Sequence, residues 1–486
     1  MGEYLLVIDE GTTSTRAMLF RPDGACVASE AAPLTQSYPR PGWVEHNAAE
    51  IWRKSLRVAG AMVAQAGGPE RIAAIGVTNQ RETVVFWDRE TGEPLAPAIV
   101  WQDRRTADNC ERLKKEGYEA EVQAKTGLLL DPYFSSSKIE WAYSFWPQLC
   151  EAGNRLAAGT IESWLVYKLT GAHITDATNA SRTSLMNIVS GDWDDGLLDL
   201  FAVPRVVLPE IVDCAGGFGT TRAFGPPIPI CGLAGDQQAA SIGQACLRPG
   251  ETKATFGTGA FILTHTGADA LPSDHRLLST VAWRLGGETA YALEGSVFVA
   301  GSLVQWLRDG LKLISSAPET EALAREVPDN GGVYLVPALS GLGAPHWRPE
   351  ARAAISGLTF SATRAHVARA ALEAQSYQAH DLKRAFASDG RDWDVLRIDG
   401  GMVANDWLAQ DLADMLGLTV ERPRFAETTA LGAAMLAGLG CGMFADLDEA
   451  SAMRGEVERF EPRIGADERA ARLAGWRRAV EAVLRG

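Results

Sequence analysis

Apolar residues gather in short runs along the first half of the chain, with segments of helical spacing between the runs. Residues 4–8 are almost entirely apolar and do not alternate with polar residues, which predicts a buried strand. Residues 71–78 and 83–88 also predict strands, and a short polar stretch separates them. Strands that alternate with helices in this way are typical of an α/β fold.

A helix is predicted after the opening hairpin, beginning just behind Asn47. The Asn47 side chain can act as the N-cap, and Glu50 supplies an acid three residues later. Four apolar residues then recur at helical spacing and are expected to line one face of the helix: Trp52, Leu56, Ala59 and Val63.

The second half of the chain opens with the same pattern as the first. A strand enters the turn at residues 257–259 and leaves as another strand, as residues 4–20 do around Gly11. Residues 395–399 form one more predicted strand, which ends in an acid and two glycines before a helix. The repeated pattern predicts a duplicated fold with a cleft between the two copies.

The boundary between the copies is expected near Arg248-Pro249-Gly250, which interrupts the pattern. We therefore predict two domains, residues 1–244 and residues 245–486. The last segment, 466–485, is predicted to be an amphipathic helix packed on the second domain.

Composition limits the classes of function. The chain has 486 residues, 46% of them hydrophobic and 22% charged, as in a folded protein of more than one domain. Its net charge of −15 argues against nucleic acid or an anionic membrane as the main partner. The seven cysteines are scattered and never in CxxC spacing, which favours free thiols in a reducing compartment. No apolar run approaches the roughly 18 residues of a membrane span. We expect a cytoplasmic protein without membrane insertion.

Phosphate chemistry is suggested where predicted strands end in glycines. The chain has no GxxxxGK[ST] loop, but acids, hydroxyls and glycines meet at residues 9–15, 257–259 and 399–401. Hydroxyls and exposed backbone N–H groups suit phosphate, and a neighbouring carboxylate suits Mg²⁺. Each stretch alone could be an ordinary polar turn. Together, at equivalent places in two halves, they predict a nucleotide held across a cleft.

A second set of residues could bind another substrate, although each member has a structural explanation. Arg81 and Glu82 follow a strand and could form a solvated turn, Trp101 could be a core aromatic, and Tyr133 could anchor a loop. Asp236 stands between an apolar strand and a helix of small residues. It could cap that helix or serve as a base at the floor of the cleft.

Nine motifs in this order resemble the FGGY family of carbohydrate kinases over essentially the full length: DEGTTSTR, GWVEHN, TNQRET, WQDRRT, DPYFSSSK, TNASRT, GDQQAA, FGTGAF and DGG. NQRET and DPYF are typical of the members that phosphorylate glycerol. The resemblance implies two actin-like, ribonuclease-H-like domains that close over ATP and the polyol, with Mg²⁺ as cofactor. It also implies a homo-oligomer, a dimer or tetramer, although no residue pattern decides its size.

The resemblance implies roles for particular positions of this sequence. Asp236 would be the general base. Residues that would bind glycerol hydroxyls are Arg81, Glu82, Tyr133, Asp236 and Gln237. Trp101 and Phe261 would form walls along the carbon backbone. Residues of the first domain that would approach the nucleotide phosphates are Thr12, Thr13, Ser14 and Arg16, with Asp9 near Mg²⁺. Residues of the second domain that would hold the nucleotide are Thr258, Gly301, Gln305, Gly401 and Asn405.

Two departures from the family pattern and two rival functions remain open. Glu10 stands where members commonly carry glutamine, and we expect it to add negative charge near the metal and phosphates. Residues 216–230 lack the glycine- and lysine-bearing pattern of the fructose-1,6-bisphosphate site of some bacterial members, which argues against that inhibitor. A kinase for another short polyol such as erythritol is the nearest rival. A non-catalytic sugar-responsive binding protein would be expected to lack Asp9 or Asp236, and both are present.

Overall fold

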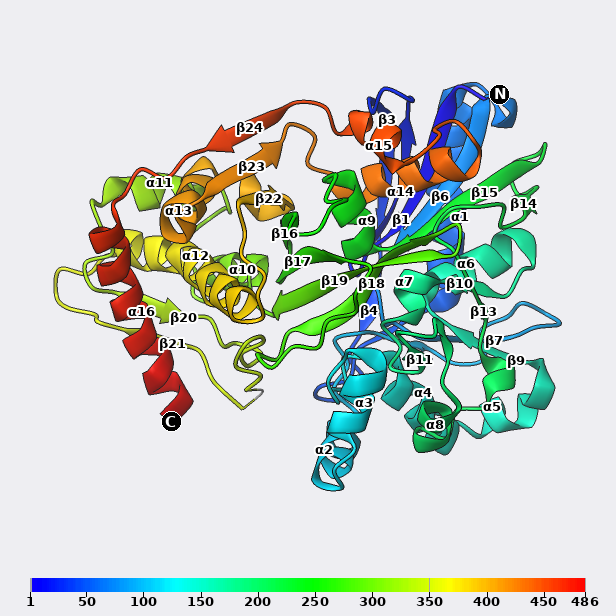
Figure 1. Ribbon diagram of the computed structural model, residues 1–486, viewed down its shortest axis with the longest axis horizontal. Coiled ribbons are helices and arrows are strands. Elements are labelled where there is room, and N and C mark those ends of the chain that lie inside the picture. The colour runs from blue at the N-terminus through cyan, green and yellow to red at the C-terminus, as the bar shows by residue number, and fades with distance from the viewer. Residues whose placement is uncertain (1, 349, 486) are drawn as a thin grey trace.

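The computed structural model describes residues 2–348 and 350–485 and has two lobes, each built on one mixed sheet (Figure 1). The first sheet contains, in spatial order, β14 (Thr220–Thr221), β15 (Ile228–Gly235), β6 (Ile72–Asn79), β1 (Tyr4–Glu10), β2 (Ser14–Phe20) and β3 (Cys26–Pro33). β1 runs parallel to β6, and β6 runs parallel to β15. β1 and β2 form an antiparallel hairpin. The carboxyl ends of three parallel strands therefore meet at one edge, beside the hairpin turn.

The second sheet repeats this arrangement. Its strands, in spatial order, are β18 (Leu278–Leu285), β19 (Glu288–Val297), β17 (Ala260–Gly267), β16 (Thr252–Phe256), β22 (Val395–Asp399), β23 (Thr419–Pro423) and β24 (Val457–Phe460). β16 pairs with β17 as an antiparallel hairpin and with β22 in parallel, as β1 does with β2 and β6. The duplicated α/β fold predicted from the sequence is confirmed.

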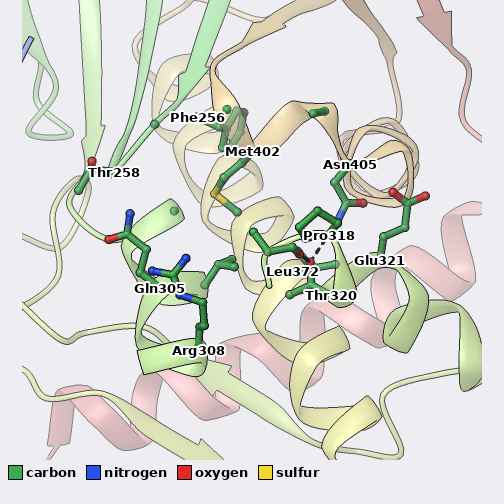
Figure 2. A pocket seen from close by; sticks show the side chains of 16 residues that line it. Phe256, Thr258, Gln305, Arg308, Pro318, Thr320, Glu321, Leu372, Met402 and Asn405 are labelled. Atoms are coloured by element: carbon green, nitrogen blue, oxygen red, sulfur yellow. Dashed lines mark hydrogen bonds between the residues drawn. The ribbon is translucent and has the colours of Figure 1, made fainter. Parts of the chain in front are cut away.

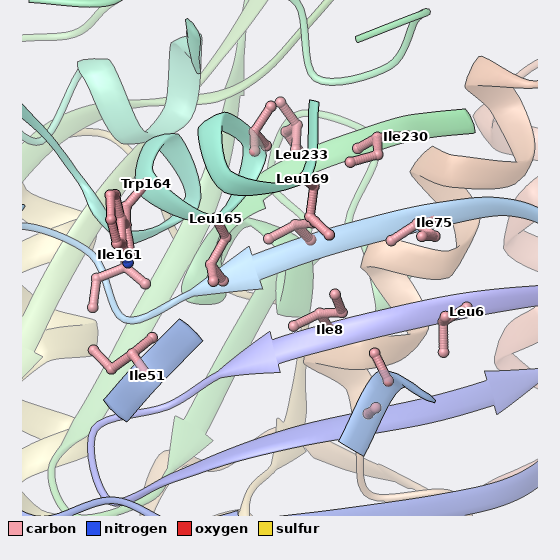
Figure 3. Close-up of a cluster of buried hydrophobic side chains, with 14 of the residues drawn as sticks. Leu6, Ile8, Ile51, Ile75, Ile161, Trp164, Leu165, Leu169, Ile230 and Leu233 are labelled. Carbon is pink, nitrogen blue, oxygen red and sulfur yellow. The ribbon is translucent and has the colours of Figure 1, made fainter. Parts of the chain in front are cut away.

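Helices cover both faces of the first sheet. Alternate side chains such as Leu6 and Ile8 point toward α1 (Ala48–Ala66) and α6 (Ile161–Thr170), where they join a cluster that includes Ile51 and Trp164 (Figure 3). Their neighbours along β1, such as Leu5, point to the opposite face, toward α9 (Asp236–Gly243) and α14 (Thr428–Gly440).

The buried face of α1 differs from the predicted one. Asn47 caps the helix, because its side chain accepts a hydrogen bond from the backbone N–H of Glu50. The fully buried positions in the middle of the helix are Ile51, Ser55, Val58, Ala59, Met62 and Val63, while Trp52 and Leu56 lie half-buried at the margin. Trp52 still packs against the core cluster at this margin. The prediction was wrong at Leu56, because polar Ser55 occupies the buried position beside it.

Helix α14 comes late in the chain yet packs on the first sheet. A Cβ atom at Gly76 of β6 would lie 2.4 Å from the backbone oxygen of Ala433, and one at Gly232 of β15 would lie 2.4 Å from the backbone nitrogen of Ala437. Only glycine allows so close an approach of helix and sheet. The predicted boundary between residues 244 and 245 separates the strands of the two sheets. It stays a prediction as a domain boundary, because α14 lies after it in the chain but packs on the first sheet.

The second lobe is mainly covered by the following helices: α10 (Gly301–Asp309), α11 (Glu319–Glu326), α12 (Arg364–Ser388), α13 (Asp406–Leu416) and α16 (Ala466–Arg485). α16 has the predicted bounds and buries Leu473 and Trp476 against this lobe, as expected. Further helices are α2 (Ala107–Lys115), α3 (Glu119–Thr126), α4 (Ser135–Phe145), α5 (Pro147–Ala152), α7 (Ala177–Ala180), α8 (Asp195–Leu200) and α15 (Leu447–Ala450). Among the described residues, none of the helices has the length and apolar character needed to cross a bilayer.

Small sheets complete the structure. Their strands are β4 (Gln36–Ser37), β5 (Glu45–His46) and β8 (Ala98–Ile99); β7 (Val85–Asp88) and β9 (Leu156–Gly159); β10 (Ile174–Asp176) and β13 (Glu210–Val212); β11 (Met186–Asn187) and β12 (Asp192–Trp193); β20 (Tyr334–Val336) and β21 (Ala354–Ser356). Short 3₁₀ helices span Pro69–Arg71, Gly153–Arg155, Arg205–Val207, Gly401–Ala404 and Ser451–Arg454.

Candidate active site

The Arg81 side chain lies at the carboxyl edge of the first sheet and is surrounded by carboxylates. Its Nη1 is 2.6 Å from Oε2 of Glu294, and its Nη2 donates to Oε1 of the same residue at 3.3 Å. Its Nε lies 3.2 Å from Oδ1 of Asp236. Only 2% of Arg81 is exposed, so the solvated turn considered from the sequence is wrong for this residue. A buried guanidinium with such partners is held in one orientation.

Glu82 is also buried, and a second arginine holds it. The backbone of Glu82 has a φ of 61°, an unusual value for a residue other than glycine. Its Oε1 accepts a hydrogen bond from Nε of Arg182 at 2.7 Å. Burial raises the pKa of Glu82, while Arg81 and Arg182 oppose that shift. The strained backbone thus aims a carboxylate into the charged cluster rather than into solvent.

Arg182 and Glu294 were missed by sequence reasoning. Arg182 stands inside the TNASRT motif, which was noted only for its resemblance to the family. Glu294 is an acid between apolar residues in the interior of β19, and neither Arg182 nor Glu294 is measurably exposed. A charged residue in a core strand requires a buried partner of opposite charge, and this was the available signal.

Aromatic side chains lie beside the charged cluster. The ring of Trp101 packs edge-on to Tyr133 and Phe261, with centroids 5.6 Å and 6.3 Å away. The indole Nε1 of Trp101 donates to Oγ1 of Thr12 at 2.9 Å. The Arg81 guanidinium carbon lies 5.8 Å from the centre of the Phe261 ring. The structure therefore brings the three predicted wall and pocket aromatics together, and ties them to the first hairpin.

Asp236 is the first residue of α9, where β15 ends between the two lobes. Its Oδ1 accepts from the backbone N–H of Gln237 at 2.7 Å, and its side chain is still 32% exposed. Burial raises the pKa of Asp236, whereas Arg81 and Lys253 lower it. Lys253 Nζ donates to the side-chain oxygen of Gln237 at 2.5 Å. The Asp236 carboxylate therefore contacts the backbone at the start of α9 and remains accessible. Its raised pKa also makes it a stronger base than an ordinary aspartate.

The hairpin between β1 and β2 presents the predicted phosphate-binding residues. The backbone N–H of Gly11 donates to the carbonyl of Ser14 at 3.0 Å, which closes the turn. Thr12 and Ser14 are half-buried and Thr13 is exposed. Arg16 forms an ion pair with Glu427, the residue that precedes α14.

Asp9 occupies an environment that favours a cation. Burial raises the pKa of Asp9 to about 7 against the effect of Arg16. The nearby carboxylates of Glu427 and Asp236 raise it as well. A Mg²⁺ ion would relieve this accumulation of negative charge, so the residues present fit such an ion. Within residues 2–348 and 350–485 no three His, Cys, Asp or Glu side chains converge on a metal position.

Glu10 does not face the phosphates, contrary to the sequence-based expectation. It shares the α1 side of β1 with Ile8, and its Oε2 accepts a hydrogen bond from Oγ of Ser55 at 2.7 Å. The side chain is fully buried, and burial raises its pKa to about 8. Burial therefore favours the uncharged form of Glu10, and its contact with Ser55 argues against the additional negative charge expected near the metal.

A cavity of about 350 Å³ in the second lobe contains all five residues predicted there to hold the nucleotide: Thr258, Gly301, Gln305, Gly401 and Asn405 (Figure 2). A Cβ atom at Gly301 would lie 2.6 Å from the backbone oxygen of Gly257, so only glycine fits at this first residue of α10. Val304, Pro318, Leu372 and Met402 give the cavity an apolar wall, which sequence reasoning missed. These four residues come from separate segments, and no local pattern marks them.

Family comparisons agree with this geometry. The N-terminal domain of the FGGY family of carbohydrate kinases matches residues 4–243, and its C-terminal domain matches residues 252–441. The chain belongs to the FGGY family of carbohydrate kinases. The first match spans every strand of the first sheet, and the second match spans the second sheet except β24.

Individual relatives resemble the chain over nearly its whole length. A glycerol kinase of Gluconobacter oxydans is 54% identical over 490 residues, which cover 99% of this chain and 96% of the relative. The crystal structure of Plasmodium falciparum glycerol kinase with ADP is 36% identical, with a TM-score of 0.91 and coverage of 100% of this chain and 99% of the other. A xylulose kinase from Rhodospirillum rubrum is 26% identical, with a TM-score of 0.85 and 99% coverage of both chains.

Proposed function

We infer that this chain transfers the γ-phosphoryl group of ATP to glycerol, giving sn-glycerol 3-phosphate and ADP. The observation that carries this function is the buried Arg81 guanidinium, held among carboxylates beside an accessible Asp236. The 54% identity to a glycerol kinase over 99% of the chain supports the same substrate.

Recognition of glycerol rests on hydrogen bonds, because so small and polar a molecule buries little area. A buried donor or acceptor that the wrong ligand leaves unpaired costs roughly 1–3 kcal/mol. Arg81 donates, the carboxylates of Glu82 and Asp236 accept, and the Tyr133 hydroxyl can do either. Gln237 adds an amide, and the rings of Trp101 and Phe261 cover the C–H surface.

Phosphoryl transfer needs an acceptor for the hydroxyl proton. As a glycerol oxygen bonds to the γ-phosphorus, the bond from that phosphorus to the β–γ bridging oxygen breaks and ADP leaves. The Asp236 carboxylate takes the proton of the attacking hydroxyl, and its raised pKa makes it a stronger base than an ordinary aspartate.

The hairpin and the second-lobe cavity would hold ATP on the other side of Asp236. The residues proposed for the phosphates are Thr12, Thr13, Ser14 and Arg16, and those proposed for the remainder of the nucleotide line the cavity at Thr258, Gly301, Gln305, Gly401 and Asn405. Asp9 would bind Mg²⁺, which when bound neutralises charge on the transferring phosphoryl group.

A coupled ATP-turnover assay with glycerol, erythritol and xylulose tests the proposal. We expect kcat/KM for glycerol to exceed that for either other compound by at least about tenfold. Faster turnover of erythritol would instead support the rival polyol kinase. Saturable glycerol binding without ADP formation would support the non-catalytic binding protein.

Two finer expectations belong with this function. The homo-oligomer stays a prediction, and light scattering on the purified protein would distinguish a monomer from a dimer or a tetramer. The cytoplasmic location also stays a prediction, and fractionation of the producing cells would test it.

A further inference from the structure

Glu294 reaches the polyol residues from the opposite lobe. It lies in β19, within the second sheet, and is completely buried. One of its oxygens, Oε2, contacts Arg81 Nη1 at 2.6 Å. The other, Oε1, accepts from Arg182 Nη2 at 2.9 Å and from Arg81 Nη2 at 3.3 Å. A single carboxylate of the second lobe therefore holds two arginines of the first lobe.

These contacts determine which edge of each guanidinium faces the carboxylates of the first lobe. With both Nη atoms of Arg81 turned to Glu294, its Nε edge faces Asp236 at 3.2 Å. With Nη2 of Arg182 on Glu294, the Nε of Arg182 donates to Glu82 at 2.7 Å. Glu294 thus orients, through the two arginines, both carboxylates assigned to the polyol.

The charge on Glu294 is secured by the same contacts. Burial alone would raise the pKa of its carboxyl, but Arg182 and Arg81 lower it to about 2. Without this charge, the Nη atoms of Arg81 would lose their charged partner and keep only the 3.3 Å contact of Nη1 with the side-chain oxygen of Gln238, so the fork could turn toward Asp236. Such a two-pronged pair would occupy the Arg81 donors and the Asp236 acceptors that the polyol hydroxyls need, so the affinity for the polyol would fall.

We propose that Glu294 is a positioning residue for polyol binding, which holds the Arg81 fork from the opposite lobe. The polyol pocket is then complete only when the lobes take the arrangement seen here, although glycerol itself is bound by residues other than Glu294. This inference rests on the proposed function.

A pair of matched variants tests the role. Glu294→Gln keeps the size of the side chain and removes its charge. The control is Glu373→Gln in α12, because Glu373 is also buried between two arginines. Its Oε1 accepts from Arg369 Nε at 2.9 Å and lies 3.3 Å from Arg472 Nη2. Both variants remove a buried charge with two arginine partners, but Glu373 does not contact the polyol residues described here.

Steady-state kinetics should separate the two variants. We expect Glu294→Gln to raise the glycerol KM at least about tenfold, with the ATP KM within about twofold of the wild type. For Glu373→Gln we expect a lower melting temperature but a glycerol KM within about twofold of the wild type. An unchanged glycerol KM in Glu294→Gln, or an equal rise in both variants, would overturn the positioning role.

A second variant and a wild-type assay cover the cases in which Glu294→Gln cannot be measured or the enzyme is inactive. If Glu294→Gln fails to fold, Glu294→Asp retains the charge with a shorter reach, and its glycerol KM must rise at least about threefold for the role to stand. Wild-type protein is assayed first with glycerol. Failure of the wild type to form ADP would contradict the proposed function itself, whereas normal wild-type turnover with an unaffected variant contradicts only the role of Glu294.

Discussion

The two ends of the proposed active site, one for the polyol and one for the nucleotide, differ in the side chains that form them. At the polyol end, buried ionic groups from both lobes are held by short contacts, such as the 2.6 Å contact between Arg81 and Glu294. At the nucleotide end, a cavity of about 350 Å³ lies within the second lobe and has apolar walls such as Leu372 and Met402. Its polar groups include the neutral Thr258 and Asn405 as well as the charged Arg308 and Glu321 (Figure 2).

This contrast follows from the size of the ligands. Apolar burial contributes about 25 cal/mol per Å², so a large nucleotide gains affinity from surface contact whereas glycerol gains little. A small polyol must be selected by directional hydrogen bonds from groups whose positions do not vary. Buried ion pairs with several hydrogen bonds provide such positions, at a desolvation cost that can exceed the attraction between the charges. Substitutions at the two ends should therefore affect different kinetic constants.

The largest effect is expected from Asp236→Asn. The asparagine has almost the same size and can still hydrogen-bond the hydroxyl, but it cannot take its proton. General base catalysis typically contributes about 10²- to 10⁴-fold, so kcat should fall by at least roughly 10²-fold. ATP binding and the melting temperature should change little. If Asp236 served only to cap α9, asparagine would replace it with near-normal turnover, since both residues are good caps.

Arg81→Lys should produce the next largest effect, confined to the polyol end. Lysine keeps the charge but replaces the planar fork, which now makes contacts to both Glu294 and Asp236, with a single ammonium. We expect the glycerol KM to rise about tenfold or more, equivalent to about 1.4 kcal/mol, with the ATP KM nearly unchanged. A glycerol KM equal to that of the wild type would remove Arg81 from the pocket.

Met402→Ala makes the corresponding test at the nucleotide end. Met402 lines the cavity and belongs to no charged network, so its loss removes apolar surface without leaving an unpaired charge. We expect the ATP KM to rise about three- to tenfold, as lost contact of about 1 kcal/mol implies. The glycerol KM should remain within about twofold of the wild type. Equal rises in both constants would show that the two ends are not independent.

Sequence reasoning located the parts of the site that lie within continuous motifs. The hairpin around Gly11 and the acid at Asp236 were predictable because a strand, a turn and a polar run follow one another in the chain. The direction of Glu10 was also available, because side chains two residues apart along a strand share a face, and Ile8 packs toward α1. The expectation that Glu10 adds charge near the metal and phosphates conflicts with this alternation.

The remaining parts depend on pairing between distant segments. Arg81 and Glu294 are separated by 213 residues, so no local pattern could join them. The same holds for Leu372 and Met402, whose apolar character indicates burial but not which cavity they line. α14 was unpredictable as a cover for the first sheet, because its position requires Gly76 of β6 to lie against it.

The smallest effect should come from a buried carboxyl outside both ends, Glu162 of α6. It is as fully buried as Glu294, but its partners are the hydroxyls of Thr160 and Thr175. Burial and neighbouring Asp176 raise its pKa above the ordinary 4.5, whereas arginines lower that of Glu294. Glu162 and Glu294 are equally buried, so the opposite directions of their pKa shifts follow from their different partners.

The sign of the pH effect follows from proton binding. Because the pKa of Glu162 is raised in the folded state, the folded protein binds more protons than the unfolded chain once the pH exceeds about 4.5, and stability falls as pH rises. Glu162→Gln has no proton to lose, so its melting temperature relative to the wild type should increase from pH 5 to pH 8, on the order of one to three degrees. Calorimetry at both pH values measures the difference, and kcat and both KM values serve as the control because they should not change. A melting-temperature difference that is the same at pH 5 and pH 8 would mean that Glu162 ionises in the folded protein as it does in the unfolded chain. Burial without a charged partner would then not be enough to keep this carboxyl neutral.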